Sequence, residues 1–338
     1  MFLKGQALFR LIRNYNFTKK FPFAVSWHVT DHCNACCHYC DHRFRKTEDL
    51  PTADMIKILN SLQLARIKMV MFSGGEPLLR QDLDQLVSLA KSLGMFVAVS
   101  TNGSLLKKRI ELMKQFNFIK ISLDGDLDTH DGIRGSGSFA HVLSAIELCK
   151  SFKIPLRLSS VICNENALKL QPITDLARYY KVKVKFQPAS NIHTRANVSD
   201  PLKLISLENF KHAYQFLSGE RKNNKYIVNS PRSLAYYNSA VANNNQLHVF
   251  KCRSTLLTTI ISSDGFLSPC VPLMNHIRID CRGRDANKIV DAFNEVHLKM
   301  DGVLQNCRKC WCLNGLELNS FLSHPSNLLT VINKVFSV

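Results

Sequence analysis

The sequence predicts an α/β fold, a partial (β/α)6 barrel with a small cysteine-rich C-terminal α+β extension, from three observations. Six β-rich runs alternate with helical patterns over residues 24–187, the alternation then stops, and cysteines gather near the C-terminus. Parallel strands need crossover connections, so the alternation indicates a parallel sheet with outer helices. Six units are too few to close an eightfold barrel, and we therefore expect an open or partial one.

The elements of the barrel follow one another along the chain. The expected strands are 24–30, 68–73, 95–100, 118–123, 155–162 and 182–187. The helical patterns between them open at Thr52 and then cover 82–93, 105–116, 139–152 and 168–180. In such sheets, ligands gather where the C-terminal ends of the strands emit their loops, so these loops are the candidate site.

The remaining segments are expected to form a short N-terminal arm and a C-terminal domain. Two helices are expected near 207–217 and 232–243, and Asp264-Gly265 favours a tight hairpin between 256–261 and 266–267. We expect three parts: a basic amphipathic arm over 1–20, a core over 21–240 and a cysteine-rich domain over 241–338. The arm is compatible with peripheral contact to an anionic membrane, or with docking on the protein's own core.

Composition restricts the class of protein. Hydrophobic residues make up 46% and charged residues 21% of 338, which are ordinary values for a globular chain. The net charge of +18 favours an acidic partner, such as a phosphorylated substrate, nucleic acid, an anionic membrane or an acidic redox protein. No run approaches the length of a bilayer helix and no secretory signal is present, so we expect a cytoplasmic protein with reduced thiols. Clustered cysteines are then expected to bind metal rather than to form disulfides.

A cysteine motif follows the first expected strand, in Cys-Asn-Ala-Cys-Cys-His-Tyr-Cys. Its C-x3-C-x2-C spacing is formed by Cys33, Cys37 and Cys40. Three thiolates at this spacing can hold three corners of a cubane iron–sulfur cluster and leave its fourth iron open. Cys36 is surplus and is interpreted as structural, although the sequence leaves open whether it could replace Cys37. Structural zinc prefers four ligands and is the alternative; its set would be completed by Cys36, His32 and His38.

The cysteine motif and the loops that follow the next strands together resemble the motifs of the radical S-adenosylmethionine (SAM) superfamily. Tyr39 stands at the family's aromatic position beside the last cysteine. The segment Gly74-Gly75-Glu76-Pro77 matches the motif that holds the amino group of SAM, for which a carboxylate and a closely approaching backbone are suited.

Further loops continue the resemblance in the same order. Ser100 and Asn102 match the segment that contacts the ribose of SAM, and Ser122 and Asp124 follow the fourth strand at the corresponding place. Arg134 matches an arginine that faces the SAM carboxylate, and 161–164 is where the adenine rests in relatives. All these loops leave the C-terminal ends of successive strands, so they are expected to converge on one mouth.

A second group of cysteines lies near the C-terminus. Cys252 precedes a hairpin that carries Gly265 and Cys270, and Cys307-Arg308-Lys309-Cys310-Trp311-Cys312 follows later. This pattern is similar to the SPASM/twitch extension of radical SAM enzymes, which implies one auxiliary 4Fe-4S cluster, with zinc as the alternative. The implied ligands are Cys252, Cys270, Cys307 and Cys310, with Cys312 as a substitute for Cys310. Small buried hydrophobes are the interpretation of the remaining three: Cys149, Cys163 and Cys281.

The resemblance implies an oxidoreductase that cleaves SAM reductively to a 5′-deoxyadenosyl radical and abstracts hydrogen from a small-molecule or peptide substrate. Dehydrogenation or crosslinking is the expected outcome, and a flavodoxin or ferredoxin the expected electron donor. About twenty residues precede the first strand, too few for a leader-binding domain, which weakens the peptide alternative. A non-enzymatic zinc protein that binds nucleic acid is the competing class. It explains the charge but neither the Gly-Gly-Glu-Pro motif nor the six βα units, and nucleic acid is not expected as a partner.

Overall fold

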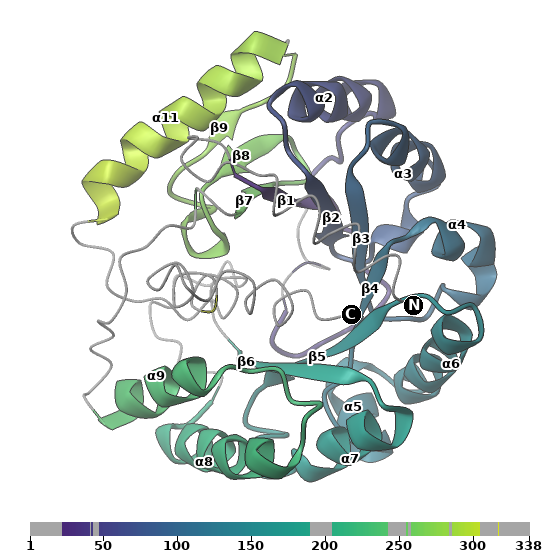
Figure 1. Cartoon of the computed structure of the whole chain (residues 1–338), viewed down its shortest axis with the longest axis vertical. Helices are drawn as coiled ribbons and strands as arrows, with labels where there is room; N and C mark the ends of the chain where they lie inside the picture. Colours follow the sequence, from purple (N-terminus) through teal and green to yellow (C-terminus); the bar gives the residue numbers. More distant parts are fainter. Residues whose placement is uncertain are drawn as a thin grey trace.

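The computed structural model describes residues 22–40, 42, 47–189, 205–242, 255, 258–283, 286–304 and 317. Within these ranges nine strands form one sheet in the order β6-β5-β4-β3-β2-β1-β7-β8-β9. Figure 1 shows this sheet curling into an open barrel with the helices on its outside. The expected partial barrel is confirmed.

The first six strands are parallel neighbours and match the expected strands to within one residue at each end. Their apolar side chains are buried against the helices, since strands covered on one side by helices must bury that face. The strands are β1 Ala24–Thr30, β2 Met69–Gly74, β3 Phe96–Thr101, β4 Phe118–Ser122, β5 Leu156–Ile162 and β6 Lys183–Pro188.

The outer helices are also present where helical periodicity predicted them. They are α2 Thr52–Leu64, α3 Leu83–Ser92, α4 Ile110–Gln115, α6 Ser138–Ser151 and α7 Gln171–Tyr180. A 3-10 turn over Lys107–Arg109 precedes α4. Among the helices between the barrel strands, α5 Leu127–Arg134 was not expected. It begins where Asp126 accepts a hydrogen bond from the Thr129 backbone N–H and ends at Gly135, whose φ is +112°.

The C-terminal part joins the barrel sheet rather than standing apart from it. The expected hairpin is confirmed as β7 Thr258–Ile261 and β8 Phe266–Ser268, with Gly265 in the turn at a φ of +86°. Strand β7 pairs in parallel with β1, and the short β9 Ile279–Asp280 extends the sheet beyond β8. The hairpin therefore lies beside the strand that leads into the cysteine loop.

Three more helices complete the described structure. The two expected helices are confirmed as α8 Leu207–Asn223 and α9 Pro231–Ala242. Helix α11 Ala286–Leu304 was not expected and packs against α2, β8 and β9. None of the helices in the described part of the chain is long and apolar enough to cross a membrane. The arm 1–20 and the loop 191–200 lie outside the described residues, and the three domain boundaries stay predictions.

Candidate functional site

The cysteine loop leaves the C-terminal end of β1 and is fixed at its base by a buried carboxylate. Asp31 is 5% exposed, pairs with His42 through Nδ1 at 2.8 Å, and accepts a hydrogen bond from Thr47. Ser263, in the turn between β7 and β8, donates to the same carboxylate at 3.0 Å. The hairpin beside β1 therefore helps to hold the start of the cysteine loop.

The four cysteines of the loop are half-buried thiols. The pKa of the Cys33 thiol is raised to about 12, mainly by burial and in part by the nearby Glu76, Cys37 and Cys40. These thiols are therefore close enough to repel one another as thiolates. Such a site needs a cation to hold the anions, which an iron–sulfur cluster supplies.

The loop after β2 packs backbone to backbone on the cysteine loop. The Gly75 N–H donates to the Thr30 carbonyl and the Glu76 N–H to the His32 carbonyl, both at 2.8 Å. A Cβ on Gly75 would lie 2.1 Å from the His32 oxygen, and one on Gly74 would lie 2.3 Å from the Thr30 oxygen. Only glycine fits at these two positions, so the sequence Gly74-Gly75 sets the distance between the two loops.

The Glu76 carboxylate joins the loop after β2 to the loop after β3. It is fully buried, accepts from Thr101 Oγ1 and the Asn102 N–H at 2.8 Å each, and accepts from the Leu78 N–H at 3.2 Å. Burial raises the pKa of Glu76 to about 7 against the opposite effect of these hydrogen bonds. Pro77 follows as the first residue of a 3-10 turn over Pro77–Leu79.

An exposed polar trio links the cysteine loop to the loop after β3. Asn102 Nδ2 donates to Asn34 Oδ1 at 2.8 Å, and Asn34 Nδ2 donates to Ser104 Oγ at 2.9 Å. The Ser104 N–H in turn donates to Asn102 Oδ1 at 2.9 Å. The three side chains hold the exposed edge of the mouth together, with Asn102, the expected ribose contact, at their centre.

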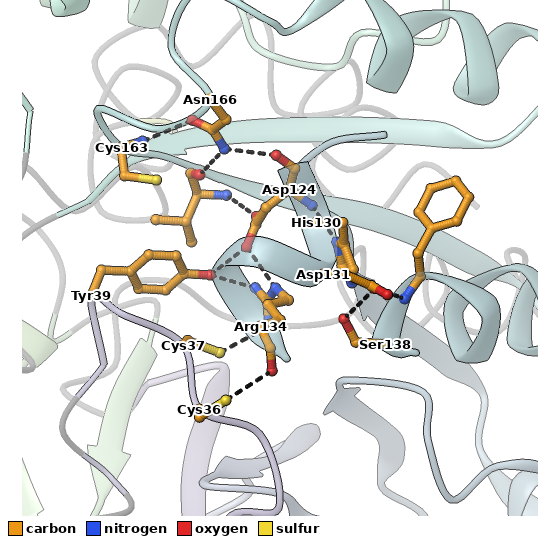
Figure 2. Close-up of polar contacts among 12 residues, drawn as sticks. Cys36, Cys37, Tyr39, Asp124, His130, Asp131, Arg134, Ser138, Cys163 and Asn166 are labelled. Carbon is orange, nitrogen blue, oxygen red and sulfur yellow. Dashed lines mark hydrogen bonds and ion pairs between the residues drawn. The ribbon is translucent and has the colours of Figure 1, made fainter. Parts of the chain in front are cut away.

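Figure 2 shows a buried network at the ends of β4 and α5. Asp124 is fully buried and receives Arg134 Nε at 2.6 Å, the Tyr39 hydroxyl, and the Val161 N–H at 2.8 Å. Arg134 also donates to the Tyr39 hydroxyl and, through Nη1, to Cys37 Sγ at 3.6 Å. Three of the expected SAM-contacting residues are therefore bonded to one another and to an expected cluster ligand.

The Cys36 side chain lies against the C-terminal end of α5. Its N–H and its Sγ both approach the Arg134 carbonyl, at 3.3 Å and 3.6 Å. A Cβ on Gly135 would lie 3.1 Å from the Cys36 sulfur. Cys36 thus packs on the end of α5 (Figure 2), which agrees with its interpretation as a structural residue.

Two polar residues of this network were missed at the sequence level. Asn166 is fully buried and donates through Nδ2 to the Asp124 and Val161 carbonyls, both at 2.8 Å. His130 accepts from the Asp124 N–H through Nδ1 at 3.0 Å, and burial lowers its pKa to about 4. The four-residue spacing of His130 and Arg134 on one helix face was the available signal, whereas no local pattern marks Asn166.

The remaining expected site residues lie partly at the mouth and partly beyond the described chain. Ser100 is in β3 and Ser122 ends β4, both half-buried. Cys270 follows β8 and is half-buried. The other expected auxiliary ligands, Cys252, Cys307, Cys310 and Cys312, lie outside the described residues. The three cysteines read as small hydrophobes, Cys149, Cys163 and Cys281, are buried.

The three cysteines of the C-x3-C-x2-C motif are chemically suited to bind a cubane iron–sulfur cluster. Cys33, Cys37 and Cys40 are thiols on one loop, and cysteine thiolates are the ligands that hold iron–sulfur clusters. Within the described ranges, no three His, Cys, Asp or Glu side chains are arranged to hold a single metal ion. A cubane places each thiolate on a different iron, so its cysteines need not converge on one point.

The barrel part of the chain matches a known protein family. Residues 27–177 match the model of the Radical SAM superfamily. This range begins in β1 and ends in α7, so it contains the cysteine loop, the glycine loop and the network of Figure 2. The resemblance predicted from the motifs is confirmed.

Curated relatives match the same part of the chain. The Fe-coproporphyrin III synthase of Methanosarcina barkeri is 30% identical over 173 residues, which cover 49% of this chain and 43% of that protein. The mycofactocin maturase MftC of Mycolicibacterium smegmatis is 27% identical over 200 residues, covering 57% of this chain and 51% of that protein. The chain thus spans about half the length of the curated relatives it matches.

A solved structure matches a larger part of the chain. The crystal structure of Streptococcus suis SuiB bound to precursor peptide SuiA aligns with a TM-score of 0.64 at 16% identity. The alignment covers 87% of this chain and 70% of that chain. At this identity the match shows a shared fold.

Proposed function

Because the chain belongs to the radical SAM superfamily, we propose that it is an enzyme that cleaves SAM reductively and uses the product to oxidise a peptide. The observation that carries this proposal is the convergence of the cysteine loop, the Glu76 loop and the Asp124 network on one mouth. A zinc protein that binds nucleic acid is not favoured, since it explains neither this convergence nor the family match.

The family implies a 4Fe-4S cluster and SAM as cofactors, and we assign Cys33, Cys37 and Cys40 as the cluster ligands. When bound, the cluster supplies one electron to the sulfonium of SAM and an open iron for its amino and carboxylate groups. Cys36 is left out of the ligand set because its sulfur faces the Arg134 carbonyl.

The chain's own residues then position SAM. Glu76 holds the backbone of Gly74-Gly75-Glu76-Pro77 against the loop after β3, which fixes the segment assigned to the amino group. We assign Ser100 and Asn102 to the ribose of SAM. Ser122, at the end of β4, is assigned to the same SAM site. Arg134 is oriented by Asp124 and Tyr39, so its guanidinium stays at the mouth beside Cys37.

We further assign the second group of cysteines to one auxiliary 4Fe-4S cluster. Its proposed ligands are Cys252, Cys270, Cys307 and Cys310, with Cys312 as the substitute for Cys310. Four protein ligands would leave no iron open, which suits a centre that accepts an electron rather than one that binds SAM. This cluster would sit in the proposed domain 241–338.

A peptide is the substrate favoured by the relatives. One relative is named a maturase, and the structural neighbour holds a precursor peptide. A small molecule is the second candidate, because another relative is named for the synthesis of a porphyrin. A flavodoxin or ferredoxin is the proposed electron donor, since the charge of +18 would attract an acidic redox protein.

Anaerobic purification with iron, sulfide and zinc analysis tests the class of protein. We expect about eight irons and eight sulfides for two 4Fe-4S clusters. Incubation with dithionite and SAM should release 5′-deoxyadenosine and methionine. Cys37→Ala should abolish this release, and Cys36→Ala is the matched control that should retain it. Cys310→Ala should keep the SAM cluster, spare some uncoupled SAM cleavage and block turnover. Zinc without sulfide would overturn the proposal.

A further inference from the structure

The edge of the barrel opposite the candidate site carries only positive charge in its linking segments. Strands β2 to β6 begin at this edge, and each follows the C-terminal end of an outer helix. The segments that link helix to strand are 65–68, 93–95, 116–117, 152–155 and 181–182, and 224–227 follows α8 beside β6. They contain no aspartate or glutamate. Their cations are Arg66, Lys68, Lys153, Lys181 and Lys225. These segments, with the last turns of the helices that lead into them, are called the basic rim below.

The last turns of the helices add further positive charge to the basic rim. Their lysines are Lys91 in α3, Lys114 in α4, Lys150 in α6 and Lys222 in α8. The helix dipole favours a cation at the C-terminal end of a helix, so a cation at each of these places has a local reason. The dipole does not explain the aromatic side chains that lie among these cations.

Contacts between neighbouring helix ends make the basic rim continuous. Lys114 Nζ lies 4.8 Å from the centre of the Phe152 ring, which brings the end of α4 to the end of α6. Lys150 Nζ lies 5.5 Å from the centre of the Tyr180 ring, which brings the end of α6 to the end of α7. The cations and the aromatic rings therefore share one surface.

The carboxylates nearest to the basic rim lie in the last two turns of the helices, and most of them are paired. Glu111 pairs with Lys114 at 2.7 Å. Asp175 and Glu220 both pair with Arg178, at 2.9 and 2.5 Å. The remaining one, Glu147, bonds to Tyr180. These contacts leave most of the rim cations to other partners or to water.

Positive charge therefore accumulates on the rim. In the described part of the chain, no carboxylate forms an ion pair with Lys153, Lys181 or Lys222, and all three lysines are exposed. Burial and the neighbouring Lys225 ammonium lower the pKa of Lys183. An extended anionic surface would relieve this repulsion.

Two aromatic side chains are exposed on the basic rim. Tyr179 is 77% exposed and Phe152 is 42% exposed, although large aromatic residues usually bury most of their surface. The Tyr179 and Tyr180 rings meet edge to face, 4.9 Å apart. Lysines interspersed with exposed tyrosine and phenylalanine are typical of surfaces that lie at the boundary between lipid and water.

The basic rim and the candidate site lie at opposite ends of the same strands. Strand β2 runs over Met69–Gly74 from the rim to the glycine loop, a length of about 20 Å. A partner bound at the rim therefore leaves the mouth open to substrate and to the electron donor. A redox protein that reduces the cluster is expected at the mouth, so we do not assign the rim to it.

We propose that the basic rim binds a membrane surface that contains anionic lipid. The rim lysines meet the lipid phosphates, while Tyr179 and Phe152 enter the headgroup region. Each lysine near such a surface strengthens binding about fivefold. The enzyme is then held with its mouth facing away from the lipid, which goes beyond the proposed function and does not depend on it.

Vesicle flotation of the anaerobic full-length protein tests the proposal. The vesicles contain phosphatidylcholine alone or with about one third phosphatidylglycerol, which is anionic. We expect binding to the anionic vesicles only, and weaker binding as the salt concentration rises. Lys153→Gln combined with Lys181→Gln should weaken binding about 25-fold. Tyr179→Ser should weaken it severalfold without changing the salt dependence, because no charge is removed.

Lys169→Gln combined with Lys211→Gln is the charge-matched control. Both lysines are exposed, Lys169 in the loop after β5 and Lys211 in the first turns of α8, so they lie toward the opposite edge. This variant should bind the vesicles as the wild type does. Lys222→Gln repeats the test at a helical position and should weaken binding about fivefold, which keeps the test available if the double variant has a lower thermal midpoint.

Three results would overturn the proposal: binding that is equal for, or absent from, both kinds of vesicle, an equal loss in the rim and control variants, or tighter binding of nucleic acid. For the last, a single-stranded RNA oligonucleotide is titrated into the same samples, and preferred binding that the rim variant loses would assign the rim to nucleic acid. Dithionite-driven release of 5′-deoxyadenosine is measured in parallel. If the wild type releases it without binding vesicles, only the membrane proposal fails, whereas vesicle binding without release counts against the proposed function alone.

Discussion

Arg134 Nη1 lies 3.6 Å from Cys37 Sγ, while Nε of the same guanidinium donates to Asp124 at 2.6 Å. A helix C-terminus and a buried carboxylate thus hold a cation against an expected cluster ligand (Figure 2). Each of the three guanidinium nitrogens donates to a different residue, Nε to Asp124, Nη2 to Tyr39 and Nη1 to Cys37, which fixes the orientation of the group. A fixed cation beside a thiolate stabilises negative charge on the sulfur.

Asp124→Asn is predicted to destabilise the protein strongly. Its carboxylate is fully buried and Arg134 is 8% exposed, so the substitution leaves a buried cation without its counter-charge. Removing one partner of a buried pair costs about 3–5 kcal/mol. Urea denaturation of the metal-free chain measures this loss. Asp126→Asn is the matched control, since asparagine caps helices as well as aspartate does, and it should change little. Equal effects of the two substitutions would contradict the prediction.

Arg134→Gln is predicted to shift the reduction potential of the SAM cluster to a more negative value. The substitution removes a positive donor from Cys37, and hydrogen bonds to cluster sulfurs tune such potentials. A redox titration followed by electron paramagnetic resonance gives the midpoint. Arg282→Gln removes a surface arginine paired with Asp280, far along the sheet, and should leave the potential unchanged. An unaltered midpoint in the Arg134 variant would show that the contact does not tune the cluster.

Glu76 is predicted to make stability depend on pH. Burial raises its pKa from 4.5 to about 7 in the folded chain. Between these values the unfolded chain releases a proton that the folded chain keeps, so the free energy of unfolding falls as the pH rises. A shift of this size corresponds to about 3 kcal/mol, fully present below pH 4.5 and lost above pH 7.

Glu76→Gln isolates this contribution, because glutamine has nearly the same shape and does not titrate. Denaturation of the metal-free wild type and variant at several pH values gives the difference in the free energy of unfolding. That difference should change across pH 4.5–7 and be flat on either side. A difference that stays constant through this window would mean that Glu76 titrates normally.

The barrel strands were predictable because each is a local run with its own boundaries. Strand β1 matched in full, and the others within one residue. The convergence of Glu76, Asn102 and Asp124 followed from a topological rule, that successive parallel strands emit their loops at one edge. These features need no knowledge of side-chain contacts.

Features that depend on contacts between distant parts of the chain were harder to predict from the sequence. The parallel pairing of β7 with β1 joins segments more than two hundred residues apart, and nothing local specifies it. Helix α11 did have a local signal, because Ile289, Phe293, Val296 and Met300 are apolar residues at helical spacing and all four are buried. Asn166 is fixed by three separate backbone groups that only the folded chain brings together.

The contact between the glycine loop and the cysteine loop provides the last prediction. Gly75→Ala would place a Cβ 2.1 Å from the His32 carbonyl oxygen and 2.8 Å from that of Asp31. Both neighbours are backbone atoms, so the cysteine loop itself must move, and we expect loss of iron from the SAM cluster together with destabilisation. Iron analysis and urea denaturation measure the two effects.

Gly132→Ala is the control: nothing lies within 4 Å of the added methyl in α5, and alanine should stabilise the helix by about 0.5–1 kcal/mol. Retention of the full iron content by the Gly75 variant would show that the cluster loop tolerates the displacement, and the spacing set by Gly74-Gly75 would then not be required for assembly.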